Sequence, residues 1–184
     1  KEDLLKGILQ WSDMTGFRPS LGVCTIDDIS LSPETLYDRA TMALSQIPDN
    51  SADRIRIYDP GMENKLEEEW MLLSEIKNAL QHEEFTFYAQ PQCDITTGKI
   101  VGAESLVRWQ HSSKGMVPPA AFIPILEKTG FIIHLDKYVW KKVCQWMRSW
   151  IDKGYSPVPV SINISRIDIL SINVPEYLLE LIRT

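Results

Sequence analysis

The stretch IVGAESLVRW, residues 100–109, decides the fold of this chain. Its β-branched and aromatic side chains favour a strand, and alternation along a strand places Glu104, Leu106 and Arg108 on one face. The carboxylate and the guanidinium are then about 13 Å apart, too far for a direct ion pair. Each needs its own partner, because a lone buried charge costs several kcal/mol. The alternatives are that the strand ends reach solvent or that neighbouring lysines pair with Glu104.

A second strand, expected at residues 158–164, has one polar face. Its even-numbered positions are aliphatic, whereas Ser161, Asn163 and the following Ser165 are polar. A polar inner face is typical of a barrel with a ligand site at its mouth. Glu104 and Asn163 both offer hard oxygens, which suit Mg²⁺, Mn²⁺ or Ca²⁺ better than zinc. Two ligands are too few to infer a metal from spacing, and an asparagine hydrogen-bonded to neighbouring backbone fits the pattern equally well.

Helices and strands alternate along the chain, which predicts an α/β fold with a largely parallel sheet. Asp59-Pro60-Gly61 marks a boundary. The amphipathic helix after it lasts under three heptads, which favours a connection between two domains over a coiled coil. The apolar periodicity, together with Pro and Gly, predicts helices at 33–47, 62–82, 124–129, 135–152 and 174–182, and strands at 21–26, 54–58, 85–91, 100–109 and 158–164.

Composition excludes several classes of protein. The chain has 184 residues, is 44% apolar and carries a formal net charge of −6. It lacks the dense basic stripe of a duplex-binding surface, and its apolar runs fall far short of the ~20 residues that cross a bilayer. No signal-peptide core, P-loop, G-x-S-x-G motif or metal-binding histidine spacing occurs. Three widely spaced cysteines indicate neither a disulfide framework nor a zinc knuckle, which favours a cytoplasmic protein.

The second half of the chain carries a series of short motifs: FYAQP at 87–91, VGAESLVRW at 101–109, VPP and FIP at 117–119 and 122–124, and SINIS at 161–165. In order and spacing they resemble the EAL family of cyclic di-GMP phosphodiesterases. SLGVC at 20–24 and LYDRATMAL at 36–44 resemble the C-terminal part of a GGDEF domain. The resemblance implies a tandem arrangement: a degenerate GGDEF-like remnant at 1–60, a connecting helix at 61–84, and the first half of an EAL domain at 85–184.

The resemblance also implies a fold and an activity. The fold would be an incomplete TIM-like (β/α)8 barrel preceded by the α+β end of the GGDEF-like domain. The family hydrolyses cyclic di-GMP to pGpG with Mg²⁺ or Mn²⁺ in bacterial signalling. Glu104 would act through the metal, Asn163 would be a second metal ligand, and Gln90, Leu106 and Arg108 would bind the substrate. A homodimer through EAL domains is implied, with a cytoplasmic location, no membrane contact in this span, and any membrane anchor outside it.

Three departures limit what the resemblance implies. The motif reads Glu-Ser-Leu at 104–106 instead of Glu-Ala-Leu, which should be tolerated because Ser105 points away from the Glu104 face. Thr41, Ser45 and Pro48 replace the usual Asp, Tyr and Lys of the GGDEF tail, and its signature loop is missing, so we expect no cyclase activity. The chain ends before the family's further acidic ligands, so we expect an inactive fragment that is not a well-packed monomer.

Two alternatives to the phosphodiesterase remain open. One is a catalytically inactive EAL domain that binds cyclic di-GMP as a receptor or regulatory module. The other is a GGDEF-like remnant with only an oligomerisation or regulatory role. The residues that separate an enzyme from a receptor are expected beyond the sequence in hand.

Overall fold

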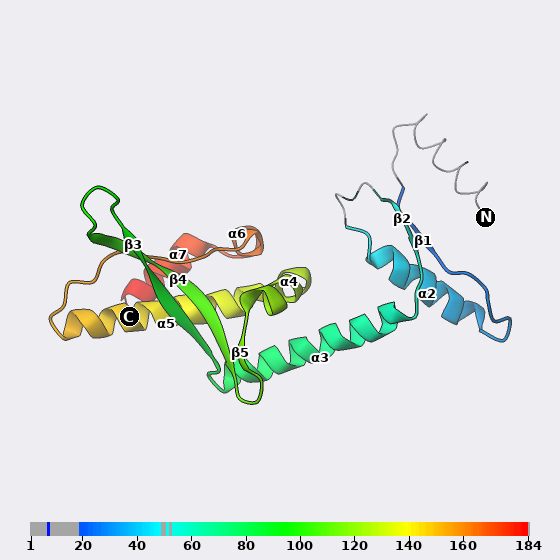
Figure 1. Ribbon diagram of the computed structural model, residues 1–184, viewed down its shortest axis with the longest axis horizontal. Coiled ribbons are helices and arrows are strands. Elements are labelled where there is room, and N and C mark those ends of the chain that lie inside the picture. The colour runs from blue at the N-terminus through cyan, green and yellow to red at the C-terminus, as the bar shows by residue number, and fades with distance from the viewer. Residues whose placement is uncertain (1–6, 8–18, 49–50, 52, 184) are drawn as a thin grey trace. The chain divides into compact units, whose positions relative to one another are not determined.

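The computed structural model describes residue 7, residues 19–48, residue 51 and residues 53–183 (Figure 1). The chain divides into two compact units, Lys1–Glu68 and Glu69–Thr184. Helix α3 (Gly61–Gln81) contributes residues to both. Within the described ranges, no helix has the length and apolar character needed to cross a membrane.

The first unit contains a parallel strand–helix–strand arrangement. Strands β1 (Leu21–Val23) and β2 (Ile55–Ile57) pair in parallel, and α2 (Pro33–Ser45) connects them. The expected start of this helix is confirmed, because the Ser32 side chain accepts a hydrogen bond from the Thr35 amide and proline occupies the first turn. Glycine is required at position 22, because a Cβ there would lie 1.9 Å from the Ala40 carbonyl oxygen.

The second unit is a small mixed sheet packed on helices. Its strands are β3 (Phe85–Cys93), β4 (Ile100–His111), β5 (Gly115–Val117) and β6 (Val160–Ser161). Strand β4 is central, with β3 along one edge and with β5 and β6 along the other. The helices after α3 are α4 (Pro119–Thr129), α5 (Ile132–Asp152), α6 (Arg166–Ser171) and α7 (Val174–Arg183).

The expectation of a largely parallel sheet is wrong. In the second unit, strands β3 and β4 are antiparallel, as are β4 and β5, whereas β4 and β6 are parallel. The turn between β3 and β4 is too short for a crossover helix. The Asp94 side chain closes it by accepting the Thr97 amide at 2.7 Å, and Gly98 supplies the positive φ of 67°.

Other differences concern the bounds of elements. The strand expected at 158–164 is reduced to β6. At its start, Pro159 has no amide hydrogen to donate to a ladder. The helix expected at 124–129 begins earlier, at Pro119, and contains Pro124 in its interior. Strand β5 and helix α6 were not expected at all. The long helices α3 and α5 and the strands β3 and β4 are confirmed, with small shifts at their ends.

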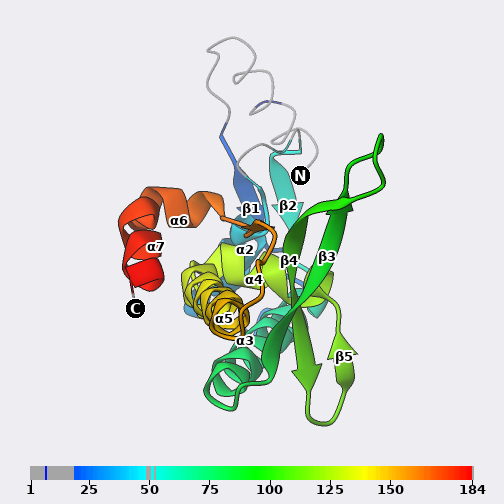
Figure 2. The ribbon, with the colours of Figure 1, turned by 90° about the vertical axis from the view of Figure 1, so that its left-hand side faces the viewer.

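The core of the second unit is built around three aromatic rings. Phe85 of β3, Trp109 of β4 and Phe122 of α4 are almost fully buried, with ring centroids 5.2–5.7 Å apart. Edge-to-face and offset contacts of this kind add to the area that the rings bury. The buried side of α5, which includes Leu135 and Val139, completes the cluster. In Figure 2, α5 is seen nearly end on, with β3 and β4 on one side and α6 and α7 on the other.

Replacing Phe122 by alanine should lower the free energy of unfolding by about 3–5 kcal/mol, because the cavity would lie against Phe85 and Trp109. Urea denaturation measures the change. Leu170→Ala is the control, because Leu170 is 86% exposed, and it should change stability by less than about 0.5 kcal/mol. A Phe122→Ala effect as small as that of the control would contradict this description of the core.

Candidate functional site

The two faces of the β3–β4 pair differ in what covers them. On one face Phe85, Ser105 and Trp109 are buried against the helices. The opposite face, called here the open face, carries side chains that are exposed or half-buried. Cross-strand pairing fixes which of these are neighbours. The pairs on the open face are Thr86 with Arg108, Tyr88 with Leu106, and Gln90 with Glu104.

Parallel pairing of β4 with β6 brings Asn163 to this face. Glu104 is in register with Ser161, and two residues further along the Asn163 side chain reaches Glu104. Its Nδ2 lies 3.4 Å from Glu104 Oε1 and 3.4 Å from the Ser105 carbonyl oxygen. The oxygen and nitrogen of the Asn163 side-chain amide are nearly the same size. Rotation of this amide by about 180° would therefore place Oδ1 beside the Glu104 carboxylate. The two expected cation ligands therefore lie together.

Helix α5 holds the backbone at Asn163. The indole Nε1 of Trp140 donates to the Asn163 carbonyl oxygen at 3.0 Å, and Trp140 is 1% exposed. Ser161 Oγ, on β6, donates to the Ala103 carbonyl oxygen at 3.3 Å. Sequence reasoning missed this polar contact of Trp140 with the loop after β6. The indole N–H of a buried tryptophan needs an acceptor, which is the signal that could have indicated this contact.

Arg108 lies further along the open face and has different neighbours. Its guanidinium carbon is 5.3 Å from the centroid of the Tyr88 ring, a cation–π contact. Its NH1 group donates to the Val107 carbonyl oxygen at 2.8 Å. Glu104 and Arg108 thus have separate partners, as their spacing along the strand predicts. Gln90 is exposed opposite Glu104, and Leu106 is half-buried between Glu104 and Arg108.

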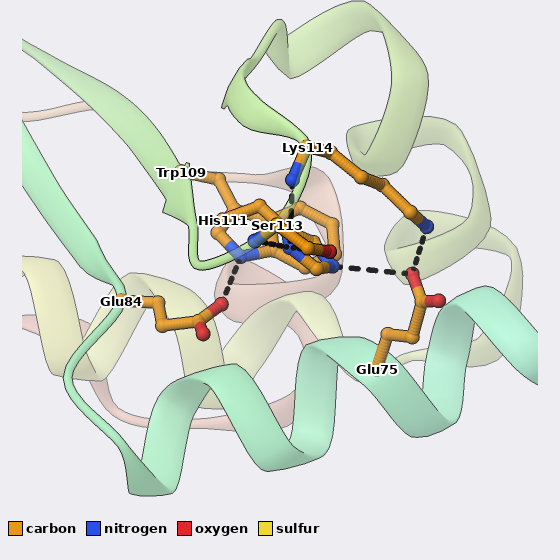
Figure 3. Close-up of polar contacts among 6 residues, drawn as sticks. All are labelled: Glu75, Glu84, Trp109, His111, Ser113 and Lys114. Atoms are coloured by element: carbon orange, nitrogen blue, oxygen red, sulfur yellow. Dashed lines mark hydrogen bonds and ion pairs between the residues drawn. The ribbon is translucent and has the colours of Figure 1, made fainter.

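A second polar cluster fixes the far end of β4 (Figure 3). Glu75 of α3 forms an ion pair with Lys114, with 2.6 Å between Glu75 Oε2 and Lys114 Nζ. The same carboxylate oxygen lies 3.7 Å from His111 Nε2. His111 Nδ1 accepts the Ser113 amide at 3.1 Å, so the ring closes the turn into β5.

In the same cluster, the Trp109 indole donates to Glu84 at 2.9 Å. This bond, ahead of contacts with Ser112, lowers the pKa of Glu84. We interpret the cluster as a structural connection between α3 and the β4–β5 hairpin.

The candidate cation site contains few charged ligands. In the part of the chain that the structure describes, no three His, Cys, Asp or Glu side chains gather as they would around a metal ion. Where β4 meets the loop after β6, the open face supplies the carboxylate of Glu104 and the amide of Asn163. Both are oxygen donors of the kind that Mg²⁺ and Mn²⁺ take. They fit such an ion as two ligands of a larger set.

The sequence profile of the EAL domain matches residues 73–184. The chain belongs to the EAL domain family. The match begins within α3 and includes every strand of the open face and Asn163.

Relatives and solved structures agree with this assignment. The bifunctional diguanylate cyclase/cyclic di-GMP phosphodiesterase MucR of Pseudomonas aeruginosa is 27% identical over 146 residues, which cover 79% of this chain and 21% of MucR. The structure of the PaMucR phosphodiesterase in complex with c-di-GMP has a TM-score of 0.57 and 27% identity, over 61% of this chain and 46% of that one. The cGMP-bound EAL enzyme Bd1971 has a TM-score of 0.58 and 26% identity, over 66% and 34%. The chain thus spans only a minor part of these proteins.

Trp140→Phe should loosen the loop after β6, because it removes the indole donor to the Asn163 carbonyl oxygen. The expected loss in free energy of unfolding is about 1–3 kcal/mol, measured by urea denaturation. Trp150→Phe, on the same helix but 39% exposed, is the matched control and should have little effect. Equal effects of the two substitutions would show that the Trp140 indole does not hold the loop.

Proposed function

We propose that this chain is part of an enzyme that hydrolyses cyclic di-GMP to pGpG with Mg²⁺ or Mn²⁺. The observation that carries the proposal is the 3.4 Å contact between Asn163 and Glu104 on the open face, in a chain that belongs to the EAL domain family. The PaMucR structure, a phosphodiesterase in complex with c-di-GMP, supports the choice of substrate.

In this proposal each residue of the open face has a separate task. Glu104 and Asn163 would hold the cation, which when bound polarises the phosphodiester and activates water. The Glu104 carboxylate also supplies negative charge that would otherwise be missing beside the ion. The remaining oxygen ligands of a hard cation would come from other groups or from water.

Arg108 would bind a phosphate of the dinucleotide. A guanidinium donates charge-assisted hydrogen bonds in a fixed planar fork, and the Tyr88 ring limits the orientations of this one. Gln90, opposite Glu104, would donate to the ligand beside the cation. Leu106 would pack against the ligand between these polar groups.

A receptor that binds cyclic di-GMP without cleaving it is the second candidate. Binding without cleavage needs the contacts of the open face with the dinucleotide but no activated water, so the residues of this face serve it equally. The same Arg108, Gln90 and Leu106 would then bind the dinucleotide. Turnover by the intact wild-type protein distinguishes the two functions.

The wider organisation is also part of the proposal. We assign residues 1–60 to the end of a degenerate GGDEF-like domain, 61–84 to a connecting helix and 85–184 to the first half of a TIM-like EAL barrel. The parallel strand–helix–strand arrangement of β1, α2 and β2 supports the first assignment. We also propose that the protein is cytoplasmic and dimerises through its EAL domains.

Glu104→Gln should abolish turnover of cyclic di-GMP in the intact protein, because it removes the charged ligand and keeps the shape of the side chain. We expect a loss of at least about 100-fold, since even residues that only support a metal ligand cost 10–100-fold when replaced. The assay follows pGpG formation with Mn²⁺. Glu67→Gln, at an exposed position of α3, is the control. Unchanged turnover by Glu104→Gln would remove Glu104 from the site.

Arg108→Ala should weaken cyclic di-GMP binding by about 1.5–3 kcal/mol, the usual contribution of a hydrogen bond to a charged partner. Isothermal titration calorimetry in the presence of Ca²⁺ measures the affinity. Arg148→Ala removes an arginine whose side chain is 71% exposed on α5 and should leave the affinity unchanged. If both variants bind as tightly as the wild type, Arg108 does not contact the ligand.

A further inference from the structure

Asp168 has a buried carboxylate, and one of its two oxygens lacks a hydrogen-bond partner among the described residues. It lies in the first turn of α6 and is 0% exposed. Its Oδ2 accepts the Ser165 amide at 2.8 Å and the Ser165 hydroxyl at 2.7 Å. Its Oδ1 is buried and has no hydrogen-bond partner among the described residues. A buried acceptor without a donor is costly, so a proton is needed at this position.

Helices α5 and α6 pack against each other, and the Asp136 side chain of α5 faces the Asp168 carboxylate. Two ionised carboxylates cannot bond to each other, because each is only an acceptor. One shared proton turns the contact into a hydrogen bond and supplies the donor that Oδ1 lacks. Asp168 is the better acceptor of the pair, since its Oδ2 already receives two donors from Ser165. Asp136 is then the group that carries the proton.

The electrostatic surroundings of Asp136 favour its neutral form. Burial, followed by the hydrogen bond and charge of Asp168, raises the pKa of Asp136 to about 8. The charged groups that face it are Asp168 from α6 and Glu127 from α4, and both are acidic. The two carboxylates therefore repel each other when both are ionised, and a single shared proton makes their contact attractive.

Asp136 and Trp140 act on the same segment of chain. They are four residues apart on α5 and so lie on one face of that helix. Trp140 holds the Asn163 carbonyl, and Asp136 contacts Asp168, whose carboxylate holds Ser165. The segment 163–168 is thus attached to α5 at both of its ends.

We propose that Asp136 and Asp168 are positioning residues for Asn163, and that the proton they share fastens the segment 163–168 onto α5. The attachment sets where the Asn163 side chain lies relative to Glu104. Its consequence for ligand binding rests on the proposed function of the open face, whereas the shared proton does not.

The attachment should weaken as the pH rises. In the unfolded chain Asp136 loses its proton near its ordinary pKa of 3.8, whereas in the folded protein it keeps the proton up to about 8. The folded state therefore binds more protons between these values, and its stability falls with increasing pH. The stabilising contribution is complete below about pH 4 and is lost as the pH passes through about 8.

Asp136→Asn tests the shared proton, because the amide is a permanent neutral donor to Asp168 Oδ1. Asp152→Asn is the matched control at an exposed position near the end of α5. Between about pH 5 and about pH 9 the unfolding midpoint of the wild type and the control should fall in parallel, whereas that of Asp136→Asn should fall much less. The ¹³C carboxyl resonance of Asp136 should titrate near pH 8. Titration of this resonance below about pH 5, or a fall in Asp136→Asn equal to that of the wild type, would overturn the proposal.

The link to Asn163 needs a separate measurement. Cyclic di-GMP affinity with Ca²⁺ should weaken above about pH 8 in the wild-type protein and stay level in Asp136→Asn. Asp136→Ala should bind about 10-fold more weakly at every pH, with rescue by the asparagine variant. Identical pH profiles for the wild type and Asp136→Asn would overturn the positioning role. Absence of binding by the wild type at every pH would contradict the proposed function, and the carboxyl titration would still decide the shared proton.

Discussion

The short parallel ladder between β4 and β6 is the contact on which the candidate site depends. It pairs Ala103 with Val160 and Glu104 with Ser161, and so places the loop that carries Asn163 beside Glu104. Since so short a ladder contributes few backbone hydrogen bonds, side chains hold the loop as well. Trp140 donates to the Asn163 carbonyl, and Asp168 holds Ser165. Helix α5 thereby positions a polar group on the opposite side of the sheet.

Strand β4 has two roles because its side chains alternate. Ala103, Ser105 and Trp109 face the helices and are buried, and the aromatic contacts of Trp109 with Phe85 and Phe122 keep this face rigid. The side chains between them, Glu104 and Arg108, are left on the open face. A functional group on a well-packed strand is more precisely placed than one on a free loop, which suits a face that must hold a cation and a phosphate at a fixed separation.

The local features of this site were predicted from the sequence more accurately than the direction of strand pairing and the contacts between distant residues. Alternation along residues 100–109 correctly placed Glu104 and Arg108 on one face, and capping residues correctly located the start of α2. The antiparallel direction of β3 was missed, although the short turn after Cys93 leaves no room for a crossover. The contact of Trp140 with the Asn163 carbonyl and that of Asp136 with Asp168 join distant residues. No local pattern encodes such contacts, because they depend on how α5 packs against the loop after β6.

The most direct test of the account is the position of the cation itself. Crystals of the intact protein grown with Mn²⁺ and cyclic di-GMP would give an anomalous difference map that locates the manganese. We predict a peak within about 2.5 Å of both a Glu104 carboxylate oxygen and Asn163 Oδ1, with the Asn163 carbonyl still bound to Trp140. Manganese bound away from Glu104, with Asn163 Nδ2 still donating to the Glu104 carboxylate, would contradict the claim that these two residues form one cation site.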